Sequence, residues 1–399
     1  MEAVDWSFDD HVPETGLFVE NQVGSVSLTA EPVHADSPWG WVADQLKANS
    51  ELFALPVERD GGVVGLIAKA KILEKASKFL ENLIPRPLDQ ELTSAGSLDA
   101  RESVEKVIIE LLKAPALDRP EIFLVYLDGK FYGMTNLRRL ASRSAELRDQ
   151  DIQKAREFQE LTMKSSHLSS PHWQLASLIR MAFGVGGDYY QEAAWPQANL
   201  GMLACFDVSG KAVAGSLVTA SLTGFFSALR QEAQTAHMTP LVLAQRLNQF
   251  LQEILPLGTF VAGLLLFVPL TLKTDAKLEI LNFGYGPVYF YQRQEKRVAG
   301  KALKPNFFFN DTATTEITAS SIFGLSVEPG TKVYAFSDGM TDLINPLGEG
   351  FGEERLRDFL TRSYKLNAAE FIAQLQTQIA SWQETAPQPD DITAVTFQF

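Results

Sequence analysis

The sequence has little of what disulfide frameworks, zinc sites and membrane spans require. Cys205 is the single cysteine among 399 residues, so no intramolecular disulfide can form, which suits a reducing cytoplasm. The five histidines never fall at paired metal-ligand spacing, which argues against a zinc site. The most apolar stretch, 260–272, is shorter than the ~20 residues that span a bilayer, and we interpret it as a buried strand. We therefore expect a cytoplasmic protein without a membrane segment.

Positive charge is also in deficit. The chain carries 35 Lys and Arg against 49 Asp and Glu, a net charge of −14. A chain of this sign has no overall attraction for a nucleic-acid backbone or an anionic membrane, so neither is expected as a partner. The hydrophobic content of 46% and charged content of 21% are ordinary for packed protein and exclude wholesale disorder. The length predicts two or three domains.

The first half contains an internal repeat. Asp60-Gly61 recurs as Asp128-Gly129, and the surrounding residues recur at the same offset. Each copy is predicted to form a strand, an Asp-Gly turn, a second strand and a helix, because Asp-Gly is favoured in tight hairpins. A further helix is predicted before each hairpin, at 39–47 and 103–113. Duplicated units of this kind bury their apolar faces against each other.

This tandem order resembles a CBS-domain pair. Such pairs often bind adenine nucleotides through a Thr or Ser and an Asp that follow the hairpin. The equivalent positions are Ala68 and Lys71 in one copy and Asn136 and Arg139 in the other, so the ribose-binding carboxylate is absent from both. We therefore expect a structural or dimerising module, with a nucleotide sensor as the alternative.

A charge-rich segment follows the repeat. Residues 145–164 contain no Gly or Pro and consist largely of good helix formers. Their apolar seam is thin for a coiled coil, and a helix that transmits dimer geometry and a solvated linker both remain open. The members of this seam are Ile152, Ala155, Gln159 and Thr162.

Four acidic motifs in the second half place aspartate at a predicted strand end or in the adjoining turn. Strand ends that face one way bring carboxylates together, and such groups raise each other's pKa unless a cation neutralises them. Oxygen ligands with retained waters are what Mg²⁺ or Mn²⁺ takes. Taken singly, each motif is more typical of a turn or a solvated surface. The motifs are Asp188 in Gly-Gly-Asp-Tyr-Tyr, Asp207 in Asp-Val-Ser-Gly-Lys, Asp338 in Ser-Asp-Gly, and Asp390-Asp391 in Asp-Asp-Ile-Thr.

The order of these motifs closely resembles the SpoIIE-type branch of the PPM (protein phosphatase 2C-like) metal-dependent serine/threonine phosphatases, over roughly 166–399. The resemblances together imply an α+β protein. A PPM-type antiparallel β-sandwich flanked by helices would follow a tandem CBS-like α/β module and a linker helix. The boundaries predicted are 1–15 for a tail, 16–76 and 77–142 for the repeats, 143–168 for the linker helix and 169–399 for the phosphatase domain.

The phosphatase resemblance also implies roles for individual residues. Asp207 and the carbonyl of Val208 would bridge two Mn²⁺ or Mg²⁺ ions, Asp338 and Asp390 would complete the second ion, and Asp188 would order the attacking water. The implied reaction is hydrolysis of phosphoserine or phosphothreonine by water activated between two ions. The implied substrate is a small phosphoprotein of a partner-switching system, such as a STAS-type anti-sigma-factor antagonist, with the N-terminal module as regulator. A homodimer is a further expectation, because CBS-like pairs and the charged helix both offer surfaces for it.

Three departures from the family pattern leave open low activity, or activity only with a bound activator. Gln191 replaces a second Asp, Ala212 replaces a Gly, and Tyr285 replaces the His of an Ala-Gly-His motif. The first two are expected to reshape the phosphate pocket, so a pseudophosphatase or adaptor that binds a partner without turnover is the alternative function. Residues 310–317 are identical to the translation of a common sequencing-adapter stretch, and we interpret them as a sequencing artefact. A genuine polar loop is the alternative, and no prediction of function is based on these residues.

Overall fold

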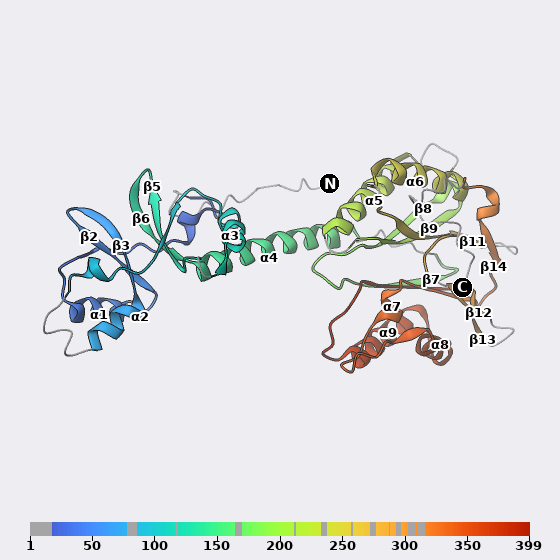
Figure 1. The fold of residues 1–399 in the computed structure, drawn as a ribbon. Coiled ribbons are helices and arrows are strands. Elements are labelled where there is room, and N and C mark those ends of the chain that lie inside the picture. The colour runs from blue at the N-terminus through green and yellow to red at the C-terminus, as the bar shows by residue number, and fades with distance from the viewer. Residues whose placement is uncertain are drawn as a thin grey trace. The chain divides into compact units, whose positions relative to one another are not determined.

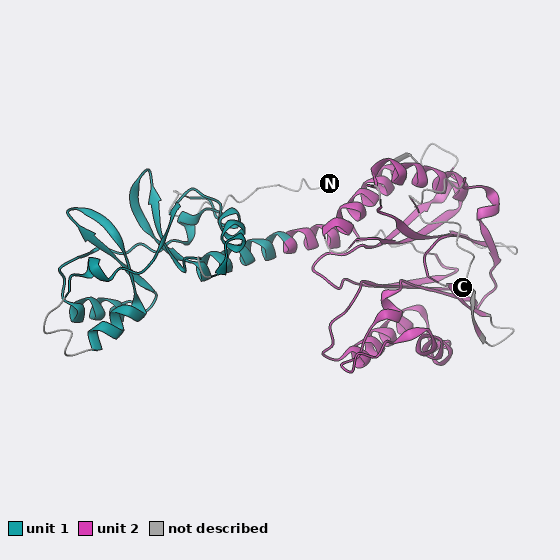
Figure 2. Cartoon of the chain, viewed as in Figure 1, with its two compact units in different colours: residues 1–151 teal, residues 152–399 magenta. Residues whose placement is uncertain are grey.

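The computed structural model describes two compact units, residues 1–151 and 152–399 (Figure 2). Helix α4 (Leu137–Thr162) follows strand β6 directly and contains residues of both units. It begins eight residues before the helix predicted from composition. The described residues are 18–77, 86–116, 119–163, 170–210, 213–232, 238–256, 258–271, 277–286, 288–292, 297–301, 309 and 316–399.

Unit 1 contains the predicted repeat. Each copy is a strand, a helix, an antiparallel hairpin and a second helix, and the first strand pairs in parallel with the hairpin. Both Asp-Gly turns adopt positive φ at both positions, with φ of 54° at Asp60 and 51° at Asp128, which confirms the predicted hairpins. The elements are β1 (Val33–His34), α1 (Trp39–Ala48), β2 (Ala54–Arg59), β3 (Gly62–Ala68) and α2 (Lys69–Ser77), then β4 (Gly96–Asp99), α3 (Val104–Lys113), β5 (Ile122–Leu127), β6 (Lys130–Asn136) and α4.

The core of unit 1 follows from the amphipathic pattern of these elements. Val42 and Leu46 on α1 and Leu66 on β3 are fully buried in the first copy, and Val107 on α3 and Val125 on β5 are buried in the second. The element order agrees with a CBS-type pair, but the family of this module stays a prediction.

Unit 2 is a sandwich of two five-stranded sheets with helices on both outer faces (Figure 1). One sheet has the order β14-β11-β10-β9-β8 and the other β13-β12-β15-β16-β7. The strands are β7 (Gln174–Arg180), β8 (Asp188–Trp195), β9 (Leu200–Val208), β10 (Val261–Pro269), β11 (Lys277–Phe283), β12 (Val288–Gln292), β13 (Arg297–Lys301), β14 (Phe323–Ser326), β15 (Lys332–Phe336) and β16 (Ile392–Gln398).

Strand β12 does not continue the sheet that contains β10 and β11. Strands β10 and β11 pair, but β12 crosses to the other sheet and pairs with β13 and β15. The reason is that β12 is apolar on both faces. Val288 and Phe290 enter the core between the sheets, whereas Tyr289 and Tyr291 enter the core under the helices. A strand of this kind needs cover on both sides.

The helices of unit 2 form the two outer layers. Helices α5 (Val213–Glu232) and α6 (Pro240–Ile254) cover the β8–β9 side of one sheet, and α7 (Gly339–Asp342), α8 (Gly352–Ser363) and α9 (Ala368–Gln383) cover the other (Figure 1). Thr239 caps α6 through the Val242 amide, and Asn367 and Glu370 form a capping box at the start of α9.

One helix in the described part of the chain, 213–230 within α5, is long and apolar enough to cross a membrane by length and composition. The same criterion is met by core helices, and Leu222, Phe226 and Leu229 of α5 are buried against the sheet. Phe309, just before the adapter-like stretch, and Ile317, its last residue, are buried in this same core. Residues 310–315 lie outside the described residues.

Candidate active site

The acidic motifs meet at one end of the sandwich. Asp188 opens β8 and is the register partner of Asp207 near the end of β9. In the other sheet, Phe336 at the end of β15 pairs with Ala394 near the start of β16, so Asp338 and Asp390 flank the same end. The two sheets are joined there by a hydrogen bond of 2.6 Å from Thr393 Oγ1 to Asp188 Oδ2.

Glycines in the motifs permit the close approach of these loops. A Cβ at Gly187 would lie 2.7 Å from the carbonyl oxygen of Val208, and a Cβ at Gly339 would lie 1.9 Å from the carbonyl oxygen of Asp391. Any side chain at either position would push the loops apart. The glycines of the Gly-Gly-Asp and Ser-Asp-Gly motifs therefore let the loops approach closely, and this approach brings the acidic side chains together.

Asp207, Asp390 and Asp391 line a small pocket of about 100 Å³, together with Val208 and Gly187. Phe183, whose side chain is exposed, also lines this pocket.

The charges in this region are poorly compensated. Burial, followed by repulsion from Asp338, Asp390 and Asp391, raises the pKa of Asp207 to about 7. Burial, and then Asp342 and Asp390, also raise the pKa of Asp338. Every charge that shifts the pKa of Asp207 is another carboxylate, so the cluster lacks a cation that would stabilise its ionised form.

The donor set fits a pair of Mg²⁺ or Mn²⁺ ions. All candidate ligands are hard oxygens: the carboxylates of Asp207, Asp338 and Asp390 and the carbonyl of Val208. Within the described residues, no three Asp, Glu, His or Cys side chains form a complete ion site by themselves. This is compatible with Mg²⁺, because that ion keeps several waters and takes only one or two carboxylates.

Asp188 lies deeper than the other acidic residues. Its carboxyl is 2% exposed, and burial, followed by the Asp207 charge, raises its pKa well above the usual range. The hydrogen bond from Thr393 fixes its orientation, and Ser337 Oγ in turn accepts from the Thr393 amide at 2.8 Å. Ser337 and Thr393 belong to the Ser-Asp-Gly and Asp-Asp-Ile-Thr motifs, but the sequence predicted no role for these two side chains.

The neighbouring carboxylates of Asp390 and Asp391 differ in their contacts. Asp391 Oδ1 accepts from the Ala182 amide at 2.7 Å, and its Oδ2 accepts from the amides of Gly187 at 2.8 Å and Asp188 at 3.3 Å. Asp391 thus anchors the loop before β8. Asp390 is half-buried at the pocket. The motif predicted an acidic pair but not this difference in contacts.

Gln159 on α4 is a second residue whose position the sequence did not predict. Its Nε2 donates to the carbonyl of Gly186 at 2.8 Å and to Thr219 Oγ1 on α5 at 3.0 Å, and its Oε1 accepts from the Gly186 amide at 3.1 Å. Ile152, two helical turns before Gln159 on the same face of α4, lies against Gly184. Two residues of the proposed coiled-coil seam therefore pack within unit 2, against the loop that carries Asp188.

The three departures from the family pattern fall in different places. Gln191 lies on the face of β8 opposite Asp188, accepts from Tyr189 Oη at 2.9 Å and donates to the Glu192 carbonyl at 2.7 Å. The expectation that Gln191 reshapes the pocket is wrong, because strand alternation points it into the core under α5. Tyr285 is buried between the sheets, and its hydroxyl has no hydrogen-bond partner among the described residues. Ala212 lies outside the described residues.

Comparison with known proteins identifies the C-terminal half. Residues 201–399 match the family model of Stage II sporulation protein E (SpoIIE). The chain is 21% identical over 269 residues to Protein IcfG of Synechocystis sp. (strain ATCC 27184 / PCC 6803 / Kazusa), which covers 61% of this chain and 41% of IcfG. The chain therefore spans less than half the length of this curated relative.

Two solved structures are similar to this chain. The SiaA-PP2C domain of Pseudomonas aeruginosa is 20% identical, covers 65% of this chain and 98% of its own, and superposes with a TM-score of 0.51. The catalytic domain of the serine/threonine phosphatase PstP, solved with two manganese ions, is 14% identical, covers 57% and 97%, and has a TM-score of 0.40. The predicted α+β sandwich with antiparallel sheets is confirmed.

Proposed function

Because residues 201–399 form a SpoIIE-family domain of the PPM-type serine/threonine phosphatases, we propose that this chain hydrolyses phosphoserine or phosphothreonine in a protein substrate, with two Mn²⁺ or Mg²⁺ ions. The observation that carries the proposal is the uncompensated acidic pocket. Burial, followed by three further carboxylates, raises the pKa of Asp207 to about 7, and a divalent cation would relieve the repulsion between these carboxylates.

Asp207, the Val208 carbonyl, Asp338 and Asp390 would hold the two ions. When bound, the two ions would supply an activated water at neutral pH and stabilise negative charge on the phosphoryl oxygens. No covalent intermediate on Cys205 is needed. Burial, followed by the Asp188 charge, raises the pKa of the Cys205 thiol, which makes a nucleophilic thiolate unavailable.

The remaining residues of the site position the reactants. Asp188, held by Thr393, would order the attacking water. Asp391 holds the amides of Gly187 and Asp188, and Gln159 holds both backbone groups of Gly186, so the loop before β8 is fixed from two sides. Such preorganisation lowers the barrier because the groups need not reorganise during the reaction.

The substrate and regulation belong to the same proposal. A small phosphoprotein of a partner-switching system, such as a STAS-type anti-sigma-factor antagonist, would be the substrate in the cytoplasm. The tandem module of unit 1 would regulate the domain, and helix α4, which follows β6 without a break, is the covalent route between them. A homodimer is the assembly we expect.

A partner-binding protein without turnover is the second candidate. It is favoured by the absence of a complete three-side-chain ion site in the described residues and by the unpartnered hydroxyl of Tyr285, where the family has His. Calorimetric titration with Mn²⁺ separates the two candidates, because an adaptor has no need of the ions.

The activity is tested with p-nitrophenyl phosphate and Mn²⁺, using wild type, Asp207→Asn and the control Asp358→Asn. Asp358 is exposed on α8, away from the acidic pocket. Loss of a shared ion ligand should lower the rate by about 100- to 1000-fold, and the control should match wild type. Equal rates for wild type and Asp207→Asn would refute the assignment.

A further inference from the structure

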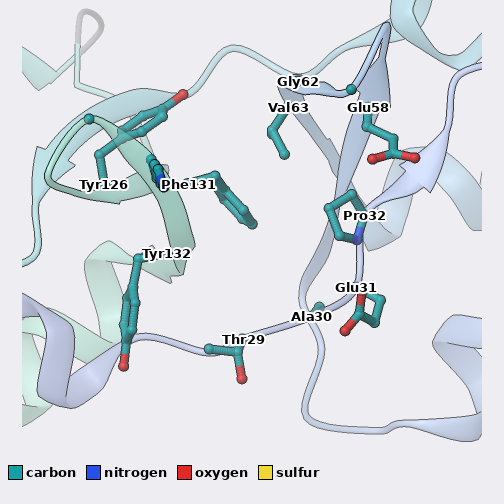
Figure 3. Close-up of a pocket in the computed structure, with 13 residues that line it drawn as sticks. Thr29, Ala30, Glu31, Pro32, Glu58, Gly62, Val63, Tyr126, Phe131 and Tyr132 are labelled. Carbon is teal, nitrogen blue, oxygen red and sulfur yellow. The ribbon is translucent and has the colours of Figure 1, made fainter. Parts of the chain in front are cut away.

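One cavity of unit 1 lies between the tips of its two hairpins. It has a volume of about 870 Å³, within the range of small-molecule sites. Its walls are the turn of β2–β3, the turn of β5–β6 and the segment 29–32 that leads into β1 (Figure 3). All of these residues belong to one compact unit.

The cavity brings equivalent positions of the two repeats together, and these positions carry different side chains. Glu58 of the first hairpin corresponds to Tyr126 of the second, and Val63 corresponds to Phe131. Each hairpin has a register shift at the same place, between Val57 and Glu58 and between Val125 and Tyr126. Bulges re-aim side chains and are frequent beside binding sites. The duplicated fold thus presents a carboxylate from one repeat and aromatic rings from the other.

The acidic wall lacks a counter-charge. Within the described residues, the side chains of Glu31 and Glu58 make no hydrogen bond or ion pair. Arg59, beside Glu58, is held elsewhere, by Asp89 at 2.6 Å and by Asp36 at 3.1 Å.

Lys130, at the second turn, is the cation that lines the cavity. Two carboxylates against one ammonium leave the lining with a net negative charge.

The opposite wall is aromatic. Tyr126 and Phe131 contact each other edge to face, with ring centroids 6.4 Å apart, and Tyr132 is held by Phe18 at 5.0 Å. Figure 3 shows the Phe131 ring projecting into the cavity from one side and the Glu58 side chain from the other. Negative ring faces beside unpaired carboxylates attract cations and repel anions.

We propose that this cavity binds a small organic amine that has an aromatic or apolar body and a positively charged group. The apolar body packs on Phe131, Tyr132 and Val63, and the ammonium lies towards Glu58 and Glu31. The site differs from the nucleotide positions that the CBS resemblance implies. Asn136 and Arg139 line an adjoining cavity, which shares Thr29 and Tyr132 with this one and carries other arginines. A phosphate would be repelled from the carboxylate wall.

The test uses the full chain and isothermal titration calorimetry with three amines, namely tryptamine, phenethylamine and spermidine, in excess Mg²⁺ to occupy the acidic pocket of unit 2. Indole-3-acetate, which shares the ring of tryptamine but carries a negative charge, is the ligand control. Titration up to about 10 mM is sufficient to measure a Kd near 1 mM, and we expect at least one amine to bind in this range. Indole-3-acetate should bind at least about tenfold more weakly.

Three variants locate the site. Glu58→Gln removes the charge and Phe131→Leu removes the ring, and each should weaken amine binding by about fivefold. Glu51→Gln, at an exposed carboxylate that lines the other cavity, should leave the affinity unchanged. Failure of all three amines to bind overturns the proposal. So does equal binding of indole-3-acetate, or wild-type affinity in both Glu58→Gln and Phe131→Leu when their circular dichroism shows an intact fold.

Discussion

Replacing Asp207 with asparagine should stabilise the metal-free phosphatase unit while removing its response to Mn²⁺. The pKa of Asp207 rises from 3.8 to about 7 in the folded chain, because of burial and of three neighbouring carboxylates. A folded pKa above the unfolded value means that ionisation opposes folding. One pKa unit corresponds to about 1.4 kcal/mol, so ionised Asp207 lowers the free energy of unfolding by at most about 4 kcal/mol above pH 7.

The sign of this effect gives it a characteristic pH dependence. Wild-type stability should fall as the pH rises from about 4 to about 7, the window between the unfolded and folded pKa values. Asp207→Asn has no such titration, so the two proteins should be equally stable near pH 4 and should diverge towards pH 8. For a unit of this size each kcal/mol moves the Tm by about 2–4 °C, so the variant should melt several degrees higher at pH 8.

Differential scanning calorimetry in EDTA and in Mn²⁺ measures both effects. Mn²⁺ should raise the Tm of wild type and leave that of Asp207→Asn unchanged, because binding to the folded state alone adds stability. A variant less stable than wild type at pH 8 without metal would contradict the electrostatic account. A variant whose Tm still rises with Mn²⁺ would contradict Asp207 as the shared ligand.

Three other substitutions test the supporting residues. Gln159→Leu should reduce the rate with p-nitrophenyl phosphate by about tenfold or more and lower stability by about 2 kcal/mol, whereas Gln153→Leu on the exposed face of the same helix should do neither. Asp391→Asn should lower the free energy of unfolding, measured by denaturant titration, by about 1–3 kcal/mol, because Asp391 accepts hydrogen bonds from three amides. Asp390→Asn should abolish Mn²⁺-dependent activity without that loss of stability. Gln191→Asp, which restores the family residue, should cost at least about 2 kcal/mol in urea unfolding and bring no gain in rate, since the side chain is buried under α5.

Local signals in the sequence were sufficient for the hairpins and caps. Asp60-Gly61 and Asp128-Gly129 specify tight turns through short-range backbone preferences, and the Asn367 and Glu370 pair specifies a helix start in the same way. The acidic motifs could also be predicted, because glycine next to aspartate reports a close backbone approach that the structure contains at Gly187 and Gly339.

What could not be predicted depends on long-range packing. The crossing of β12 between sheets is set by the helices that cover Tyr289 and Tyr291, far away in the sequence. The amide side chain of Gln159 finds its partners 27 residues or more further along the chain, so composition suggested only a weak seam. The face of β8 on which Gln191 lies requires the strand register, which the motif alone does not give.

The central claim is tested most directly by the hydrolysis of a phosphoserine peptide as a function of Mn²⁺ concentration. The account predicts no hydrolysis in EDTA, a rate that rises and saturates with Mn²⁺, loss of that rate in Asp338→Asn, and retention of it in Cys205→Ala. A rate that survives chelation, or that disappears in Cys205→Ala while Asp338→Asn remains active, would contradict it.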